Sequence, residues 1–444
     1  MFDYVGLVNF IFGTMFTIMG FLTLHFIVFA IIGLFKKRTF PKADKQLRYG
    51  IIIPARNEEA VVGNLIKSIQ KNKYPQDKLH IFLIAHNCTD RTAEIGRELG
   101  ATVYEYNNTN ECTMGYAFRY LFERIREDFG IENYDGFFLF NADNVCAENY
   151  FEKMNDAFVA EGQRSVITSF RNSKNFGSNV VSAMYGLYFV YGCRFEARGR
   201  SAMGCSTRVQ GTGYVISADL VKDGWKYVTL TEDWEFTADQ ILLGNKIVYC
   251  DDAMFYDEQP TSLRVMWRQR LRWGRGHLLV CTTRFKDLIC GLFSKSKNGL
   301  KKRRGSIYDI TVNILPVCII GVAISLMQTV ALCFSPLFGR DIFQVILAYF
   351  KSLLDGIGTS YVIAIFASII IYFAERKRLP KTSIWIKILS SLLFPAFILV
   401  SVPAEVVALF AKNLGWKAIP HTDTTNIEKL QKQRDEISNT VETK

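Results

Sequence analysis

The chain has 444 residues, 49% of them apolar, and a formal net charge of +11. That length leaves room for one sizeable globular domain plus a set of membrane spans. The charge does not favour a nucleic-acid-binding protein, because basic residues gather beside apolar segments, at Lys36–Arg38, Lys295–Arg304 and Arg376–Lys381. Basic residues beside spans mark the cytoplasmic side of a membrane and attract anionic lipid headgroups, so we expect membrane lipids as partners and no nucleic acid.

The first predicted element is an apolar segment over Tyr4–Leu34. A membrane span needs about 20 predominantly apolar residues, and this segment is longer, with no small-residue cleavage site after it. We therefore interpret it as a membrane anchor and not as a removed signal peptide. The ten cysteines show neither metal-type nor disulfide-type spacing. Six of them, from Cys88 to Cys250, fall in the segment predicted to be a cytoplasmic domain, where thiols stay reduced.

The following segments alternate between strand-like and helix-like patterns. Apolar runs typical of strands lie at Ile51–Ile53, Leu79–Ile84, Ala101–Tyr106 and Phe137–Phe140. Helix-like stretches separate them, at 61–69, 89–99 and 116–128. This alternation predicts an α/β domain with a mostly parallel, Rossmann-like sheet that helices cover on both faces.

Ligands of such sheets bind at the carboxyl ends of the strands. The residues that follow the predicted strands are therefore the first candidates for a site: Pro54–Glu59, Ala85–Asp90 and Asn141–Asn144. No Gly-x-Gly-x-x-Gly follows the first strand, and no Walker-type phosphate loop is present. Their absence disfavours dinucleotide-binding proteins and ATPases.

The last third of the chain is predicted to lie in the membrane. Ile307–Ser335 and Ile384–Ala411 are each long and apolar enough for one span. Ile342–Ala374 contains Lys351 and Asp355, so it is either one long kinked span or a short interfacial helix followed by a span. Proline interrupts helices, and two prolines lie in the last apolar segment. The side of the membrane that holds the C-terminus stays open.

Two polar clusters follow predicted strands. Pro54–Glu59 is either a polar turn that caps the next helix or part of a ligand site. Asn141–Asn144 follows the strongly apolar Phe137–Phe140. Its Asp143 either caps a turn or holds a hard divalent cation against a diphosphate, because Mg²⁺ prefers one or two carboxylates plus phosphate oxygens.

Two further clusters lie later in the chain. Glu232 and Asp233 precede a helix-like segment, so they are either charges favoured by the helix dipole or a general base for an acceptor hydroxyl. In the basic stretch 264–275, Gln269, Arg272 and Trp273 share one helical face. Arginine suits bidentate phosphate contact, and the indole ring offers a stacking surface for a sugar. An amphipathic helix on the membrane surface is the alternative, and one helix can serve both purposes.

The clusters Pro54–Glu59, Asn141–Asp143, Thr231–Asp233 and Gln269–Trp273, in this order and followed by membrane spans, resemble family 2 glycosyltransferases of the cellulose, chitin and hyaluronan synthase type. The resemblance covers roughly residues 50–279. It implies a GT-A fold, a Mg²⁺ or Mn²⁺ cofactor and an inverting single displacement. The implied reaction transfers a sugar from a nucleotide-sugar donor, a UDP-sugar, to a growing cell-envelope polysaccharide, with translocation through the membrane as an open question.

The resemblance also implies roles for individual residues. Asp233 would be the catalytic base, and Asp143 would bind the metal on the donor diphosphate. The implied donor-binding residues are Pro54, Arg56, Asn57, Glu58, His86, Asp90, Asn141, Gln269 and Arg272. The implied acceptor-binding residues are Gly211, Thr212, Gly213, Glu232 and Trp273.

Three positions depart from the family pattern. His86 and Asn141 stand where the family usually has aspartates, and Met114 stands where it commonly has a lysine. Asp90 and Asp143 remain, so we expect a working site with altered donor contacts. Two other functions stay open: transfer of a single sugar to a lipid acceptor, and a catalytically silent membrane subunit that only binds nucleotide or polymer.

These patterns predict four parts of a multi-pass cell-membrane protein whose catalytic domain faces the cytoplasm. An N-terminal transmembrane helix occupies 1–35, and the GT-A domain occupies 46–290, with an interfacial helix at 261–285. C-terminal transmembrane helices occupy 305–411, and a polar tail occupies 412–444.

Overall fold

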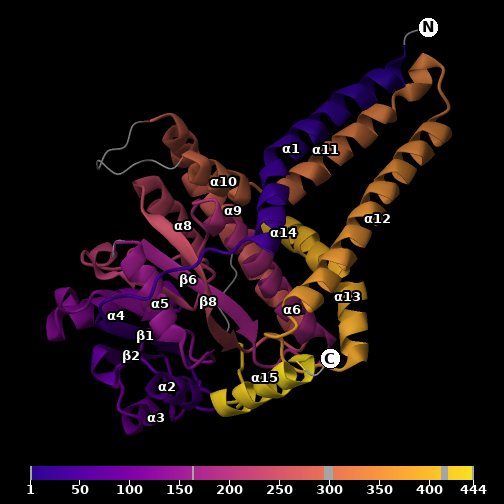
Figure 1. Cartoon of the computed structure of the whole chain (residues 1–444). Coiled ribbons are helices and arrows are strands. Elements are labelled where there is room, and N and C mark those ends of the chain that lie inside the picture. The colour runs from indigo at the N-terminus through magenta and orange to yellow at the C-terminus, as the bar shows by residue number, and fades with distance from the viewer. Residues whose placement is uncertain (1–2, 163–164, 295–303, 412–418, 443–444) are drawn as a thin grey trace.

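The structure is a computed structural model that describes residues 3–162, 165–294, 304–411 and 419–442 (Figure 1). Its centre is an eight-stranded sheet with the strand order β3-β2-β1-β4-β7-β6-β8-β5. The strands are β1 Tyr49–Ala55, β2 Leu79–His86, β3 Thr102–Tyr106, β4 Gly136–Leu139, β5 Val145–Cys146, β6 Ser165–Ser173, β7 Tyr214–Ser217 and β8 Lys246–Asp257.

The first four strands in chain order pair in parallel, as the alternating pattern predicts. Strand β7 joins them to the rest of the sheet through antiparallel pairs with β4 and β6. Strand β8 is parallel to β6 and antiparallel to β5. The sheet is therefore mixed, and its parallel half brings the ends of β1, β2 and β4 to one edge.

Helices cover both faces of the sheet, and β1 shows why. Successive side chains of a strand point to opposite faces. Ile52 packs in one buried cluster with Phe118 of α4, whereas Ile51 and Ile53 pack in another with Leu65 of α2. The helices of this domain are α2 Val62–Gln70, α3 Thr92–Glu98, α4 Met114–Asp128, α5 Tyr150–Ala160, α6 Val180–Tyr191, α7 Arg198–Ala202, α8 Glu232–Leu243 and α9 Leu263–Phe293.

The mostly apolar helices are α1 Tyr4–Phe35, α10 Arg304–Ile314, α11 Val317–Leu332, α12 Ile342–Ala374, α13 Ile384–Leu399 and α14 Ser401–Phe410. Of these, α1, α11 and α12 project away from the sheet domain, whereas α10 packs beside α8 and α9 (Figure 1) and buries Ile307, Ile310 and Ile314 there. Within the described residues, three segments are long and apolar enough to cross a membrane: Tyr4–Phe35, Ile342–Ala374 and Ile384–Phe410. The bent pair formed by α10 and α11 would make a fourth.

The segment 307–335, predicted as one span, differs from a straight helix. It contains α10 and α11, which meet at an angle of 56°. Pro316 caps α11 at this bend, and proline carries no N–H for the helix ladder. By contrast, α12 runs through Lys351 and Asp355 without a break. Of the two prolines in the last segment, Pro395 lies inside α13, and Pro403 lies in the first turn of α14.

The C-terminal segment returns to the sheet domain. Helix α15 (Ile427–Glu442) lies beside α2 in Figure 1. Ile427 and Leu430 are buried in a cluster with residues of α6 and α13, and Lys71 pairs with Glu428. The part of the predicted polar tail that the structure describes is therefore packed against the domain.

Candidate active site

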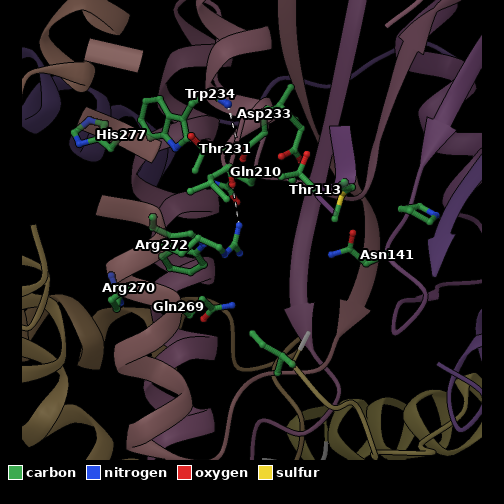
Figure 2. Close-up of a pocket in the computed structure, with 18 of the residues that line it drawn as sticks. Thr113, Asn141, Gln210, Thr231, Asp233, Trp234, Gln269, Arg270, Arg272 and His277 are labelled. Atoms are coloured by element: carbon green, nitrogen blue, oxygen red, sulfur yellow. Dashed lines mark hydrogen bonds between the residues drawn. The ribbon is translucent and has the colours of Figure 1, made fainter. Parts of the chain in front are cut away.

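A cavity of about 430 Å³ lies at the carboxyl edge of the parallel strands, between α4, α6, α8 and α9. Figure 2 shows Asp233, Arg272 and Asn141 around it, each from a different element. The predicted site residues that line the cavity are Pro54, Arg56, Glu58, His86, Asn141, Gly211, Glu232, Asp233, Gln269, Arg272 and Trp273. The four sequence clusters therefore meet at one site.

Five predicted site residues do not line this cavity, and two of them join neighbouring loops instead. Asn57 has a left-handed backbone (φ 56°), and its Oδ1 accepts a hydrogen bond from the Thr89 N–H at 2.8 Å. Asp90 accepts hydrogen bonds from the N–H groups of Glu59 and Thr92, both at 3.1 Å. These bonds tie the end of β1 to the end of β2. The donor-binding roles of Asn57 and Asp90 stay predictions.

The loop 211–213 supports the Asn141 turn. The Thr212 hydroxyl accepts a hydrogen bond from the Asn141 N–H at 2.9 Å and donates to the Asn144 carboxamide. Gly213 has φ 68°, and a Cβ there would lie 2.0 Å from the Phe255 ring, so the position requires glycine. Thr212 and Gly213 lie behind the cavity, whereas Gly211 lines it.

Asp143, the predicted metal ligand, is buried just beside the cavity. Its Oδ2 accepts the Glu258 N–H at 2.8 Å, and its Oδ1 accepts the Asn144 amide at 3.2 Å. In the part of the chain that the structure describes, no group of three or more His, Cys, Asp or Glu side chains could hold a metal ion by itself. One carboxylate does fit a cation that takes its other ligands from a diphosphate and water.

Glu232 and Asp233 form the first turn of α8, where the helix dipole favours negative charge. Burial, and then the charge of Asp233, raise the pKa of Glu232 to about 8. Burial also raises the pKa of Asp233, but the Trp234 N–H and the charges of Arg272 and Arg208 oppose that shift. Because the charge of Asp233 is itself a cause of the raised pKa of Glu232, Asp233 is the carboxyl of the pair that ionises first.

Helix α9 holds Arg272 against this acidic pair. The Arg272 Nη1 donates to the Leu230 carbonyl at 3.0 Å, directly before the α8 turn (Figure 2). Burial lowers the pKa of Arg272, and the charges of Glu232 and Asp233 counter that shift. A Cβ at Gly276 would lie 2.3 Å from the Thr231 side chain, so α9 reaches α8 only because this residue is glycine.

The same helix carries the other predicted contacts. Trp273 lies parallel to Tyr188, with ring centroids 6.3 Å apart, and both line the cavity. The Gln269 Oε1 is buried and has no hydrogen-bond partner among the residues that the structure describes. Arg270 points away from Gln269 (Figure 2), lies among rings that include Tyr188 and Phe397, and also lines the cavity. A polar atom that a ligand can satisfy therefore lies at Gln269, while Arg270 packs α9 against the candidate membrane helices α13 and α14 through Phe397 and Ser401.

Sequence patterns did not indicate several cavity residues. Arg171 donates to Asp257 at 2.7 Å and to the Gln210 carbonyl at 3.0 Å. Arg208 pairs with Glu196 at 3.1 Å. His421 lines the cavity from the C-terminal segment. These charged residues lie far apart in the sequence and form no motif. They come together at the cavity only through the mixed half of the sheet and the C-terminal segment that packs against it.

Comparisons with known proteins agree with this arrangement. Residues 47–276 match the family described as glycosyltransferase-like family 2. The chain is 26% identical over 256 residues to a probable glycosyltransferase, YdaM, of Bacillus subtilis, covering 55% of this chain and 59% of that protein. It is 25% identical over 280 residues to a beta-monoglucosyldiacylglycerol synthase of Nostoc, covering 60% and 56%. It is 23% identical over 256 residues to a poly-beta-1,6-N-acetyl-D-glucosamine synthase of Staphylococcus epidermidis, covering 54% and 58%.

A solved structure shares the fold. It is a mannosyltransferase from Pyrobaculum calidifontis, in complex with GDP-mannose and Mn²⁺. The TM-score is 0.57 at 14% identity, covering 91% of this chain and 100% of that one. At this identity the likeness shows the fold alone. The matched regions of the three sequence relatives span less than two thirds of those proteins.

The mixed sheet, the edge cavity and the apolar helices define an enzyme class, the GT-A-fold glycosyltransferases that carry candidate transmembrane helices. The family match covers more than half of the sequence. This chain is therefore a member of the family 2 glycosyltransferases.

Proposed function

We propose that the protein transfers a sugar from a nucleotide-sugar donor, with inversion, to a growing cell-envelope polysaccharide at the cytoplasmic membrane surface. The observation that carries the proposal is a single cavity that contains the Asp233 carboxyl, Arg272 and the Asn141 turn. A general base, a phosphate-binding cation and a strand-end diphosphate site are the parts that this displacement requires.

In the proposed reaction the Asp233 carboxylate takes the proton of an acceptor hydroxyl, and that oxygen attacks the anomeric carbon of the donor sugar. The bond to the donor phosphate breaks at the same time, so the nucleoside diphosphate leaves with the bonding electrons. Arg272 of α9, whose charge acts on Asp233 of α8, stabilises the negative charge that grows on the leaving group. Gln269 offers a buried carbonyl oxygen without a partner to a donor or acceptor hydroxyl.

Asp143 and the donor diphosphate together would hold the divalent cation. When bound, such a cation neutralises charge on the diphosphate. The Thr212 and Asn144 contacts keep the Asn141 turn in place beside that position. The Asp143 side chain accepts a hydrogen bond from the Glu258 N–H. Its carboxylate is therefore already positioned before a ligand binds.

The shape of the cavity supports an acceptor that arrives from the membrane side. Its lining continues from Asp233 to Asn313 of α10 and to Ser401 and Glu405 of α14. Helix α14 belongs to an apolar segment long enough for a span. The same observation supports the second candidate, transfer of one sugar to a lipid, because a lipid hydroxyl can enter along α14. A catalytically silent subunit is disfavoured because Asp233 and Arg272 are both in place.

A panel of radiolabelled nucleotide sugars, offered to the purified protein in membranes with Mn²⁺, tests the proposal. Transfer from at least one donor is expected, and the absence of transfer from every donor contradicts it. Extraction of the labelled product into organic solvent then separates a lipid-linked sugar from a long polymer.

Replacing Arg272 and Trp273 by alanine should have separate effects. Arg272→Ala removes a charge-assisted phosphate contact and should weaken nucleoside-diphosphate binding by about 1.5–3 kcal/mol. Trp273→Ala should mainly impair use of the acceptor, since its ring lies beside Tyr188 on the cavity wall. Calorimetric titration of each variant with UDP and GDP measures the difference. Equal losses of nucleotide affinity would favour a purely structural role for α9 at the membrane surface.

The pH dependence of turnover should follow the protonation of Asp233. A general base must be ionised, so kcat should fall as the pH falls through its pKa. Because burial raises that pKa, the acid limb should lie above the pH of about 3.9 at which an ordinary aspartate titrates. A pH–rate profile at saturating donor checks this. A kcat that stays constant down to about pH 4 would contradict the assignment.

A further inference from the structure

The C-terminal segment returns to the donor side of the cavity. The family match ends at residue 276, yet residues 422–424 are bonded to the sheet domain. The N–H groups of Thr422 and Asp423 donate to the two carboxylate oxygens of Glu258 at 3.0 and 2.9 Å. The Lys174 Nζ donates to the Asp423 carbonyl at 2.7 Å, and the Asn64 amide donates to the Thr424 carbonyl at 3.1 Å. The segment is thus a fixed part of the site wall.

This segment places His421 in the cavity. The imidazole Nδ1 lies 2.8 and 3.0 Å from the two carboxylate oxygens of Glu58. Both residues line the cavity. Burial alone would lower the pKa of His421, but the negative charges of Asp143, Glu58 and Glu258 raise it to about 9. The ion pair with Glu58 therefore brings a basic side chain from the tail to the strand ends where the donor diphosphate is expected.

Glu58 and His421 should have opposite effects on the binding of a donor diphosphate. The carboxylate of Glu58 would repel a diphosphate that enters the same edge, whereas an imidazolium would attract it. Hydrogen bonds between an ionised donor and a phosphate are short and roughly twice as strong as neutral ones. Because burial raises the pKa of Glu58, this carboxyl gives up its charge more readily than an exposed glutamate when an anion displaces it.

We propose that His421 binds the diphosphate of the nucleotide-sugar donor, exchanging Glu58 for phosphate oxygens, and that residues 419–424 form the tail-borne wall of the donor pocket. The inference rests on the proposed function, since it assigns one more donor contact to the same site. It gives the chain a positive charge near the donor phosphates.

The alternative is an ion pair that only fastens the tail. The structure separates the two roles, because other contacts also hold the tail. Ile427 and Leu430 are buried, the Glu258 carboxylate binds two backbone N–H groups, and Glu428 pairs with Lys71. Loss of the His421 side chain should therefore leave the segment docked.

Binding of UDP, GDP, uridine and guanosine to the full-length protein in nanodiscs, in the presence of Mn²⁺, tests this inference. His421→Gln should weaken binding of the preferred nucleoside diphosphate about tenfold or more, and binding of the matching nucleoside should not change. His421→Arg should keep part of the affinity, because it keeps a positive charge. Glu428→Gln, a change at an exposed tail ion pair, is the matched control and should bind as the wild type does.

Each other outcome counts against the inference. Wild-type affinity of His421→Gln for the nucleoside diphosphate overturns it. An equal loss of nucleoside and nucleoside-diphosphate binding overturns it too, since that result shows a collapsed pocket and no phosphate contact. A wild-type protein that binds neither UDP nor GDP would overturn the proposed function itself, and this inference with it.

Discussion

Replacing Asp233 by asparagine should lower the rate of sugar transfer by about 10²–10⁴ while donor binding stays nearly intact. Asparagine keeps the size of the side chain and its hydrogen bond with the Trp234 N–H, but it cannot take a proton from an acceptor hydroxyl. Glu232 is not expected to replace it, because burial, the largest cause of its raised pKa, also acts in this variant. The effect should therefore appear in kcat and spare the affinity for the nucleoside diphosphate.

Asp239→Asn is the matched control. Asp239 belongs to the same helix, pairs with Lys226 and Arg284 and does not line the cavity. Its substitution should leave turnover within a few-fold of the wild type. Single-turnover rates with a saturating donor separate the chemical step from product release. If Asp233→Asn kept more than about a tenth of the wild-type rate, Asp233 would not be the base.

The parallel half of the fold was predictable because its pattern is local. The apolar runs around Ile51–Ile53 and Phe137–Phe140 are buried on both sides and separated by amphipathic helices. This pattern is typical of one architecture, a parallel sheet between two layers of helices. The strand ends then follow from chain direction alone. For that reason the Asn141 turn and the Pro54–Glu59 cluster could be expected at one edge from the amino-acid pattern by itself.

The mixed half of the sheet was harder to predict from the sequence. Arg171 and Asp257 meet because β6 and β8 pair in parallel across a bulge near Ser169. No short pattern specifies such a pairing between strands about 80 residues apart. The bend at Pro316 was not predicted for a different reason. The span over 307–335 was inferred from its overall apolarity, and that average does not register one proline, which lacks the backbone N–H that a continuous helix needs.

The candidate site shows the same limit. Clusters of neighbouring polar residues, such as Glu232 and Asp233, can be recognised from the sequence alone. His421 did not, because a lone histidine in a polar tail carries no pattern until the tail packs against the sheet. Asn57 and Asp90 have the residue types of a ligand site, yet their hydrogen bonds to neighbouring N–H groups hold two loops together. Residue type alone does not separate these two uses.

Asp143→Ala should abolish metal-dependent transfer, and excess chelator should do the same to the wild type. The fit of the site to a divalent cation depends on one carboxylate, because Asn141 contributes no charge. Asp143 is buried and held by the Glu258 N–H at 2.8 Å. An alanine there leaves the diphosphate and water as the only expected ligands. Mn²⁺-dependent nucleotide binding, followed by calorimetry, checks this separately from turnover.

Asn141→Asp is the informative companion change. The Asn141 side chain lines the cavity, while its backbone N–H is already bonded to Thr212 at 2.9 Å. An aspartate should therefore keep the turn, retain activity and raise the apparent affinity for Mn²⁺, since it adds a second carboxylate of the kind that such cations prefer. A protein that transfers sugar equally well in excess chelator, or that tolerates Asp143→Ala, would remove the metal from the proposed reaction. The positive charges at Arg272 and His421 would then have to stabilise the leaving diphosphate by themselves, and their variants should show larger losses than predicted above.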